Sequence, residues 1–180
     1  MKLPSTFVKK TNNINAVIET PKGCAAKYNF DKETQLFKLK KILPEGLAFP
    51  FHFGFIPFTL AEDGDPIDVL VLMNEPSWPG CIIECKVLGI LEAEETQNKT
   101  TVKNNRIVAA AIESPVFKNN KNINSLSKDL TNGIINFFIS YTRLEEKDFN
   151  ITGKSGPSTA LHVIEKSIIK KGSSEESEQP

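Results

Sequence analysis

Apolar and polar positions give the first half of the chain the pattern of β-strands and the last third the pattern of helices. Residues 26–30 and 36–40 alternate between apolar and polar side chains on either side of a polar loop, which predicts a hairpin. Further apolar runs predict strands at residues 15–20, 66–73, 81–91 and 106–112. Many short strands joined by turns, ahead of any helix, favour a closed or nearly closed β-barrel.

Two segments between these strands have other patterns. Residues 47–60 hold five phenylalanines and two prolines, Pro50 and Pro57, so we predict a constrained, irregular aromatic run rather than a central strand. Residues 92–105 are polar and predict a loop or an exposed hairpin.

From Ser125 onward the apolar residues recur at three and four positions, which places them on one face of a helix. They are Leu126, Leu130, Ile134, Phe138, Tyr141 and Leu144. A second helix is predicted over residues 157–171, with Pro157 at its start and Gly172 at its stop. Residues 173–180 contain serine and glutamate but no apolar residue, and they predict a disordered tail after a single domain of residues 1–172.

Composition narrows the classes of function. The chain has 180 residues, with 39% hydrophobic and 24% charged, as expected of a soluble globular protein. Basic and acidic residues number 22 each, which argues against a nucleic-acid partner. No apolar leader or membrane-length run is present in the sequence, so we expect a cytoplasmic protein without a membrane partner. The three cysteines, Cys24, Cys81 and Cys85, are interpreted as reduced structural thiols.

The candidate chemistry lies in one acidic run at the mouth of a predicted strand. Asp63, Asp65 and Asp68 fall within six residues. Like charges this close repel one another and raise each other's pKa, so they call for a compensating cation, commonly a hard divalent ion such as Mg²⁺. A solvated acidic turn is the alternative, because Asp-Gly and Asp-Pro are ordinary turn dipeptides. A calcium-binding EF-hand loop does not fit, because Asp68 is followed by valine and leucine.

The run Asp-Gly-Asp-Pro-Ile-Asp-Val-Leu-Val at residues 63–71 closely resembles the signature of the soluble family I inorganic pyrophosphatases. Other stretches resemble the same family in the same order, from about residue 15 to residue 171. They are Val17-Ile-Glu-Thr-Pro21, Lys27-Tyr28, Gly54-Phe-Ile-Pro57, Pro79-Gly80 and Phe137-Phe-Ile-Ser-Tyr141. The chain is therefore identified as a divergent member of that family.

The resemblance implies a mainly β fold with α-helices (α+β), a five-stranded closed OB-like β-barrel flanked by two C-terminal helices. It implies hydrolysis of pyrophosphate to two phosphates with Mg²⁺, for which Mn²⁺ is a substitute, by a homo-oligomer. It assigns metal binding to the three aspartates and proton removal from the attacking water to Asp65. It also implies a catalytic, phosphate-binding role for Tyr141, phosphate binding by Lys27, and a supporting role for Glu19.

Several positions depart from the family pattern. Asn29 stands in place of a glutamate, Lys41 in place of a phosphate-binding arginine, and Thr142 in place of a lysine. Phe49 and Phe53 replace two tyrosines, so their hydroxyl donors are lost.

The hairpin before Arg106 also differs from the family. Arg106 stands in for a phosphate-binding lysine, and Asn104 replaces an aspartate but keeps a neutral oxygen in a supporting role. Lys99 and Lys103 bring positive charge, and no carboxylate lies between Glu95 and Glu113. We therefore expect slowed hydrolysis of pyrophosphate. The alternatives are a non-catalytic protein that binds metal or phosphate, and a phosphohydrolase acting on a larger pyrophosphate compound.

Overall fold

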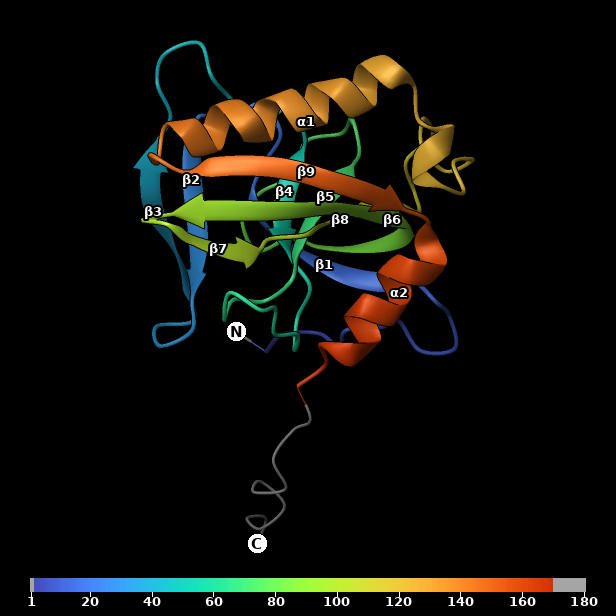
Figure 1. Cartoon of the computed structure of the whole chain (residues 1–180). Coiled ribbons are helices and arrows are strands. Elements are labelled where there is room, and N and C mark those ends of the chain that lie inside the picture. Colours follow the sequence, from blue (N-terminus) through green and yellow to red (C-terminus); the bar gives the residue numbers. More distant parts are fainter. Residues whose placement is uncertain (1, 170–180) are drawn as a thin grey trace, which may run out of the picture.

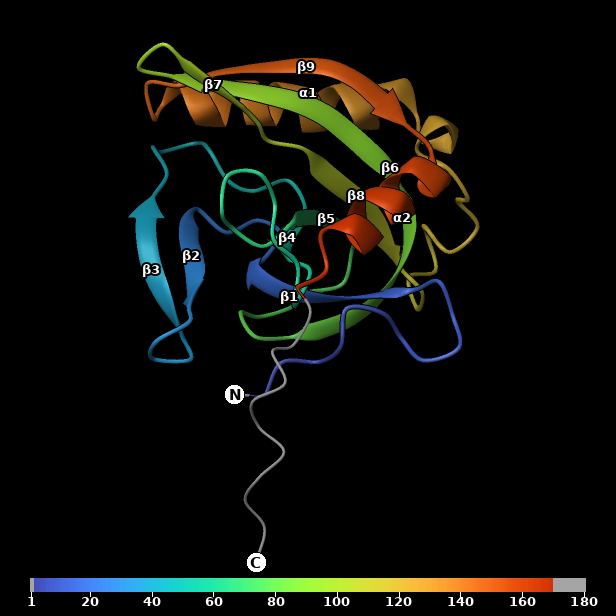
Figure 2. The same ribbon diagram turned by 60° about the horizontal axis from the view of Figure 1, so that its bottom comes forward.

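Seven strands of the described chain assemble into one strongly curved sheet with a separate hairpin beside it (Figure 1). The structure is a computed structural model that describes residues 2–169. The curved sheet contains β1 (Ile14–Thr20), β4 (His52–Phe55), β5 (Asp68–Leu72), β6 (Ile82–Gln97), β7 (Thr100–Lys103), β8 (Arg106–Ala111) and β9 (Asp148–Ser155). The hairpin consists of β2 (Ala26–Asp31) and β3 (Leu36–Ile42), and it stands to one side of the sheet in Figure 2.

The long strand β6 closes the sheet into a barrel. Within residues 2–169, hydrogen bonds run from β1 to β4, β5, β8 and β6, and residues 82–85 of β6 then pair with β1. All of these pairings are antiparallel except that of β5 with β8. The prediction of a closed, five-stranded barrel is therefore confirmed. Beyond the ring, β6 continues and pairs with β7 and β9.

Both faces of the central strands are buried, which explains their continuous apolar runs. Leu70 and Leu72 of β5 belong to an apolar cluster that includes residues of α1 (Lys128–Arg143). Val69 and Val71, on the opposite face, belong to a second cluster that includes residues of α2 (Pro157–Lys166). The two helices therefore pack on different apolar clusters of one barrel (Figures 1 and 2).

The second helix begins where the sequence predicts, whereas α1 begins at Lys128, three residues after the predicted start at Ser125. A short 3₁₀ turn (Ile123–Ser125) precedes α1, and the Ser127 hydroxyl caps the helix by accepting from the Leu130 N–H at 3.2 Å. Pro157 is the first residue of α2. The prediction that α2 runs to residue 171 is wrong, because the helix ends at Lys166. The predicted tail at residues 173–180 lies outside the described residues.

Three predictions of strands require correction. The aromatic run contains the central strand β4, and its prolines at positions 50 and 57 lie just outside the paired residues, where they cost no ladder hydrogen bond. Strand β6 extends to Gln97 instead of ending near residue 91, so residues 92–105 form the hairpin alternative. Strand β9 was not predicted, because its sequence is polar and Phe149 is its buried anchor.

Cys24, Cys81 and Cys85 are free, as predicted. In the described part of the chain, no helix is both long enough and apolar enough to cross a membrane.

Gly54 of β4 is required by close approach of the backbone of β1. A Cβ atom at this position would lie 2.0 Å from the carbonyl oxygen of Val17. We expect Gly54→Ala to destabilise the protein by about 3 kcal/mol or more, because backbone must move to admit the methyl group. Gly133→Ala is the control, since nothing lies within 4 Å of its Cβ position in α1. It should stabilise by about 0.5–1 kcal/mol. Urea unfolding measures both, and equal stability of the two variants would contradict the prediction.

His52, at the start of β4, is a fully buried residue held in its neutral form. Its Nδ1 accepts from the Lys22 N–H at 3.1 Å and its Nε2 lies 2.9 Å from the Glu75 carbonyl oxygen. Burial lowers the pKa of His52 below its usual 6.5. The unfolded chain therefore binds a proton more readily than the folded protein, so this contribution to stability is lost as the pH falls below about 6.5.

We expect the thermal midpoint of the wild-type protein to fall between about pH 7.5 and pH 5, and to fall less in His52→Gln. His162→Gln is the matched control, because this second histidine is exposed on α2. This substitution should leave the change of thermal midpoint with pH as it is in the wild type. A His52→Gln slope as steep as that of the wild type would show that this histidine does not contribute.

Candidate active site

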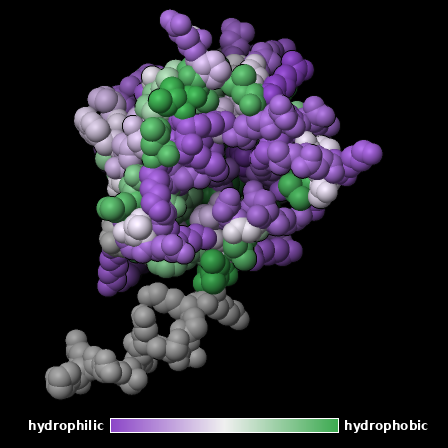
Figure 3. All heavy atoms as spheres, turned by 90° about the vertical axis from the view of Figure 1, so that its left-hand side faces the viewer, coloured by the Kyte–Doolittle hydropathy of each residue, from purple (hydrophilic) through white to green (hydrophobic). Residues whose placement is uncertain are grey.

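A cavity of about 260 Å³ opens where the β2–β3 hairpin, the acidic loop, β6, β8 and the end of α1 meet. Figure 3 shows this side of the molecule, with a hollow bordered mainly by hydrophilic residues. Eight predicted site residues line the cavity: Glu19, Lys27, Asp63, Asp65, Asp68, Asn104, Arg106 and Tyr141. The fold therefore brings together residues that are up to 122 positions apart in the sequence, from Glu19 to Tyr141.

The acidic loop is shaped by its own hydrogen bonds. The Asp65 N–H donates to Asp63 Oδ1 at 3.1 Å, and Gly64 between them has a φ of +88°, a conformation that favours glycine. Asp63 and Asp65 are exposed, whereas Asp68 opens β5 and is half-buried. The turn thus presents two accessible carboxylates beside a more buried one.

Asp68 forms an ion pair with Arg106, the first residue of β8, at 2.6 Å between Oδ2 and a terminal guanidinium nitrogen. Arg106 is buried, and it also donates to the Asn104 side-chain oxygen. Burial raises the pKa of Asp68, while Arg106 and Lys27 oppose that rise and Asp63 and Asp65 add to it.

Glu19 of β1 lies behind the aspartates. Its Oε1 accepts from the Phe30 N–H at 2.7 Å, and its residue exposure is 8%. Burial raises the pKa of Glu19 to about 7; the Phe30 hydrogen bond lowers it and the negative charge of Asp68 raises it. Burial therefore disfavours the ionised forms of Glu19 and Asp68, and a further cation in the cavity would favour them.

Lys27 reaches the cavity between two aromatic rings. Its Nζ lies 5.5 Å from the centroid of Phe53 and 5.2 Å from that of Tyr141. Burial lowers the pKa of Lys27, while Asp68 raises it. A partly desolvated ammonium of this kind interacts more strongly with an anionic group than one in water does.

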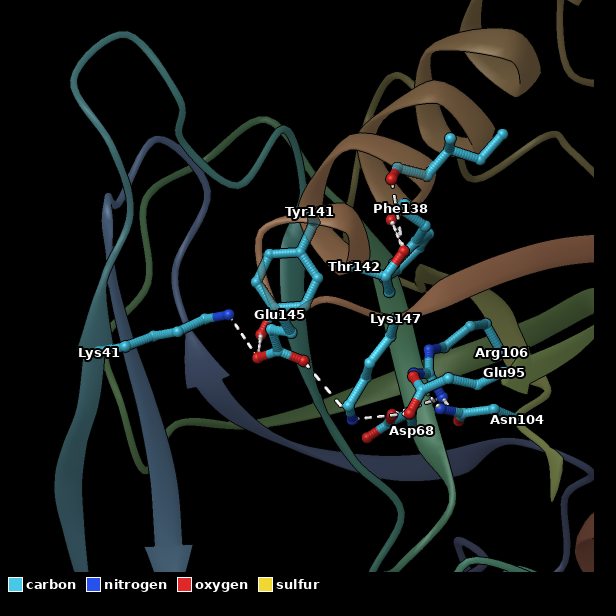
Figure 4. A network of polar contacts seen from close by, with 11 residues as sticks. Lys41, Asp68, Glu95, Asn104, Arg106, Phe138, Tyr141, Thr142, Glu145 and Lys147 are labelled. Carbon is cyan, nitrogen blue, oxygen red and sulfur yellow. Dashed lines mark hydrogen bonds and ion pairs between the residues drawn. The ribbon is translucent and has the colours of Figure 1, made fainter. Parts of the chain in front are cut away.

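Glu145, in the turn after α1, holds three polar side chains (Figure 4). Lys41 Nζ and the Tyr141 hydroxyl both donate to its Oε1, the latter at 3.2 Å, and Lys147 Nζ lies 3.6 Å from Oε2. Burial raises the pKa of Tyr141, and Glu145 adds to the rise. Lys41 contacts Glu145 rather than lining the cavity, and Lys40, its neighbour on β3, lines it instead.

A family model for inorganic pyrophosphatase matches residues 16–171 of the chain. The chain belongs to the inorganic pyrophosphatase family. It is 35% identical over 159 residues to an inorganic pyrophosphatase of Synechocystis sp., which covers 88% of this chain and 92% of that protein. It is 38% identical over 156 residues to an inorganic pyrophosphatase of Halalkalibacterium halodurans, covering 84% and 91% of the two chains. A crystal structure of inorganic pyrophosphatase from Thermus thermophilus matches with a TM-score of 0.83 at 32% identity, covering 92% and 94%.

The site of this pyrophosphatase family member differs from the sequence prediction at the β6–β7 hairpin. Glu95 was not predicted to contribute, but it lines the cavity and its Oε2 accepts from the Asn104 side-chain N–H at 3.0 Å. A signal was present, because Glu95 is two residues after the buried Ala93 and so shares its face of a strand. The interpretation of residues 92–105 as a loop or an exposed hairpin concealed that alternation.

Cations also lie elsewhere than predicted. Lys99 and Lys103 do not line the cavity, and Lys103 instead pairs on the surface with Glu62 at 3.2 Å. The Thr142 hydroxyl donates to the Phe138 carbonyl oxygen at 2.8 Å, a bond within α1 that leaves no proton for a phosphate. Lys147, which was not predicted as a site residue, supplies a cation to the part of the cavity wall that follows α1.

The two phenylalanine substitutions are not equivalent. Phe53 lines the cavity beneath Lys27, whereas Phe49 packs against the rings of Phe137 and Tyr141 and does not line it. Only the loss of a hydroxyl at position 53 therefore alters the described cavity wall.

Proposed function

We propose that this chain hydrolyses inorganic pyrophosphate to two phosphates with the aid of divalent metal ions. The observation that carries the proposal is the presence of three aspartates, two phosphate-complementary cations and a tyrosine around one cavity. The family relationship supports the same reaction.

The acidic side fits a hard divalent cation such as Mg²⁺, or Mn²⁺ in its place. Its ligands would be Asp63, Asp65 and Asp68, whose oxygens suit such ions. The buried side-chain oxygen of Asn29 has no hydrogen-bond partner among the described residues, and it lines a smaller adjoining cavity together with Asp65 and Asp68. In residues 2–169 no three acidic, histidine or cysteine side chains converge as a finished ligand set. The three carboxylates would therefore have to rotate toward one another to hold the same ion.

The bound ion supplies positive charge and lowers the pKa of water. Lys27 and Arg106 would bind the phosphate oxygens and offset the charge that develops in transfer. Asp65, the exposed carboxylate, would accept the proton of the attacking water, and the Tyr141 hydroxyl would orient a phosphate after leaving Glu145. The predictions of a cytoplasmic location and of a homo-oligomer stay as predictions.

We expect Asp65→Asn to lose about 10²-fold or more in the rate of phosphate release from pyrophosphate, because the proton acceptor and a ligand charge are both removed. The assay is run across a range of Mg²⁺ and Mn²⁺ concentrations. Asp129→Asn, an exposed substitution in the first turn of α1, is the matched control and should retain wild-type activity. Equal background rates in the wild type and Asp65→Asn would reject catalysis and favour the non-catalytic binding protein.

We expect Phe53→Tyr to raise turnover by about tenfold, because the tyrosine hydroxyl would enter the cavity beside Lys27 and restore one hydrogen-bond donor. Phe49→Tyr should leave turnover unchanged and lower stability, since its hydroxyl would be buried among aromatic rings. Steady-state kinetics and urea unfolding of both variants test this pair. A gain of turnover in Phe49→Tyr, or none in Phe53→Tyr, would contradict it.

A further inference from the structure

We propose that Lys147 is a resident cation of the active site, which pairs with Glu95, lies beside Glu145, and excludes a divalent ion from the side of the cavity formed by the β6–β7 hairpin (the hairpin side). Metal binding is thereby confined to the side formed by Asp63, Asp65 and Asp68. The inference rests on the proposed function, since it concerns the ions that enter the same cavity.

The contacts of Lys147 show why an ion would be excluded. Its Nζ lies 2.6 Å from Glu95 Oε1 and 3.6 Å from Glu145 Oε2 (Figure 4). The other oxygen of Glu95 accepts from the Asn104 side chain. Both oxygens of Glu95 thus already have N–H donors, and a metal ion would have to displace an ammonium from a partly buried, charge-assisted hydrogen bond.

The backbone holds Lys147 in this position. The turn after α1 includes Glu146 with a φ of +57°, and the Lys147 N–H donates to the Thr142 carbonyl oxygen at 3.2 Å. Strand β9 then begins at the next residue, and its Phe149 pairs with Glu95 of β6. The register of β9 on β6 therefore sets Lys147 beside Glu95.

The charges divide unequally between the two sides of the cavity. On the hairpin side, Lys147 and Lys41 balance Glu95 and Glu145. Burial lowers the pKa of Lys147, but the hydrogen bond and charge of Glu95 outweigh it and hold the pKa above its usual value, so the ammonium stays protonated.

The aspartate side lacks this balance. Lys27, Lys40 and Arg106 line the cavity there, but among residues 2–169 only Asp68 of the three aspartates forms an ion pair, with Arg106. Burial raises the pKa of Glu19, the fourth carboxyl group, to about 7. A divalent ion is therefore attracted to the exposed carboxylates on the aspartate side, whereas the positive charge of Lys147 repels it on the hairpin side.

The full-length protein is first stripped of metal and then titrated with Mn²⁺ in the absence of pyrophosphate. Equilibrium dialysis and electron paramagnetic resonance count the bound ions. We expect Lys147→Gln to bind one more Mn²⁺ per chain than the wild type, or to bind its weakest ion at least about tenfold more tightly. Lys147→Arg keeps the charge and should bind like the wild type. Lys154→Gln is the matched control, because Lys154 is an exposed lysine of β9 that does not line the cavity.

A double variant identifies the ligand of the added ion. Glu95→Gln in the Lys147→Gln background should abolish the gain, and the thermal midpoints of all variants establish that they fold. An unchanged count and affinity in folded Lys147→Gln would overturn the proposal, as would a gain that persists without Glu95. An unchanged count together with a raised KM for pyrophosphate would assign Lys147 to phosphate binding instead. Because these counts need no substrate, they decide the role of Lys147 even if the protein fails to hydrolyse pyrophosphate.

Discussion

The parallel pairing of β5 with β8 is the constraint on which the arrangement of the site depends. Val69 lies opposite Ile107 in this pairing, so the residues that open the two strands, Asp68 and Arg106, meet at one edge of the barrel. The acidic loop leads into β5 and the β6–β7 hairpin leads into β8. One strand register therefore brings Asp68 and Arg106 together as an ion pair and places the acidic loop and the β6–β7 hairpin around one cavity.

That edge carries a high density of charge in a partly buried setting. Removing charged groups from water is costly, and the cost is recovered only when each has partners. One terminal nitrogen of Arg106 has Asp68 and Asn104 as partners, although its buried Nε has no hydrogen-bond partner among the described residues. The guanidinium also lies within 6.0 Å of the ring centroids of three phenylalanines. Glu19 instead has one backbone donor, and burial raises its pKa to about 7. The ionised form of Glu19 is thus poorly compensated, and a divalent cation bound near Glu19 and the aspartates would favour that form.

The sequence predicted those features whose cause is local. Alternation along β2 and β3, the apolar run of β5, and the three- and four-residue spacing of α1 each reflect burial of neighbouring residues. The aspartates could be found because they are clustered in the chain. Strands β4 and β9 could not be found in this way, since β4 is flanked by prolines and β9 is polar, and each is held in place by strands distant in sequence. Lys147 was missed for the same reason, because its proximity to Glu95 depends on the register of β9 on β6. Glu95 was missed because residues 92–105 were interpreted as a loop or an exposed hairpin rather than as part of a long strand.

The substitutions at the cavity are better understood as a redistribution of charge than as a loss of it. Thr142 removes a cation from α1, and Lys147 restores one from the following turn. Asn104 removes an acid from the hairpin but donates to Glu95, which lies on the same wall. These two changes are coupled. With an aspartate at position 104, a second carboxylate would lie beside Glu95, and Arg106, which contacts the side chain at 104, would have to balance it as well as Asp68. The neutral side chain at position 104 and the cation at position 147 are therefore compatible, because together they keep the charge around Glu95 balanced.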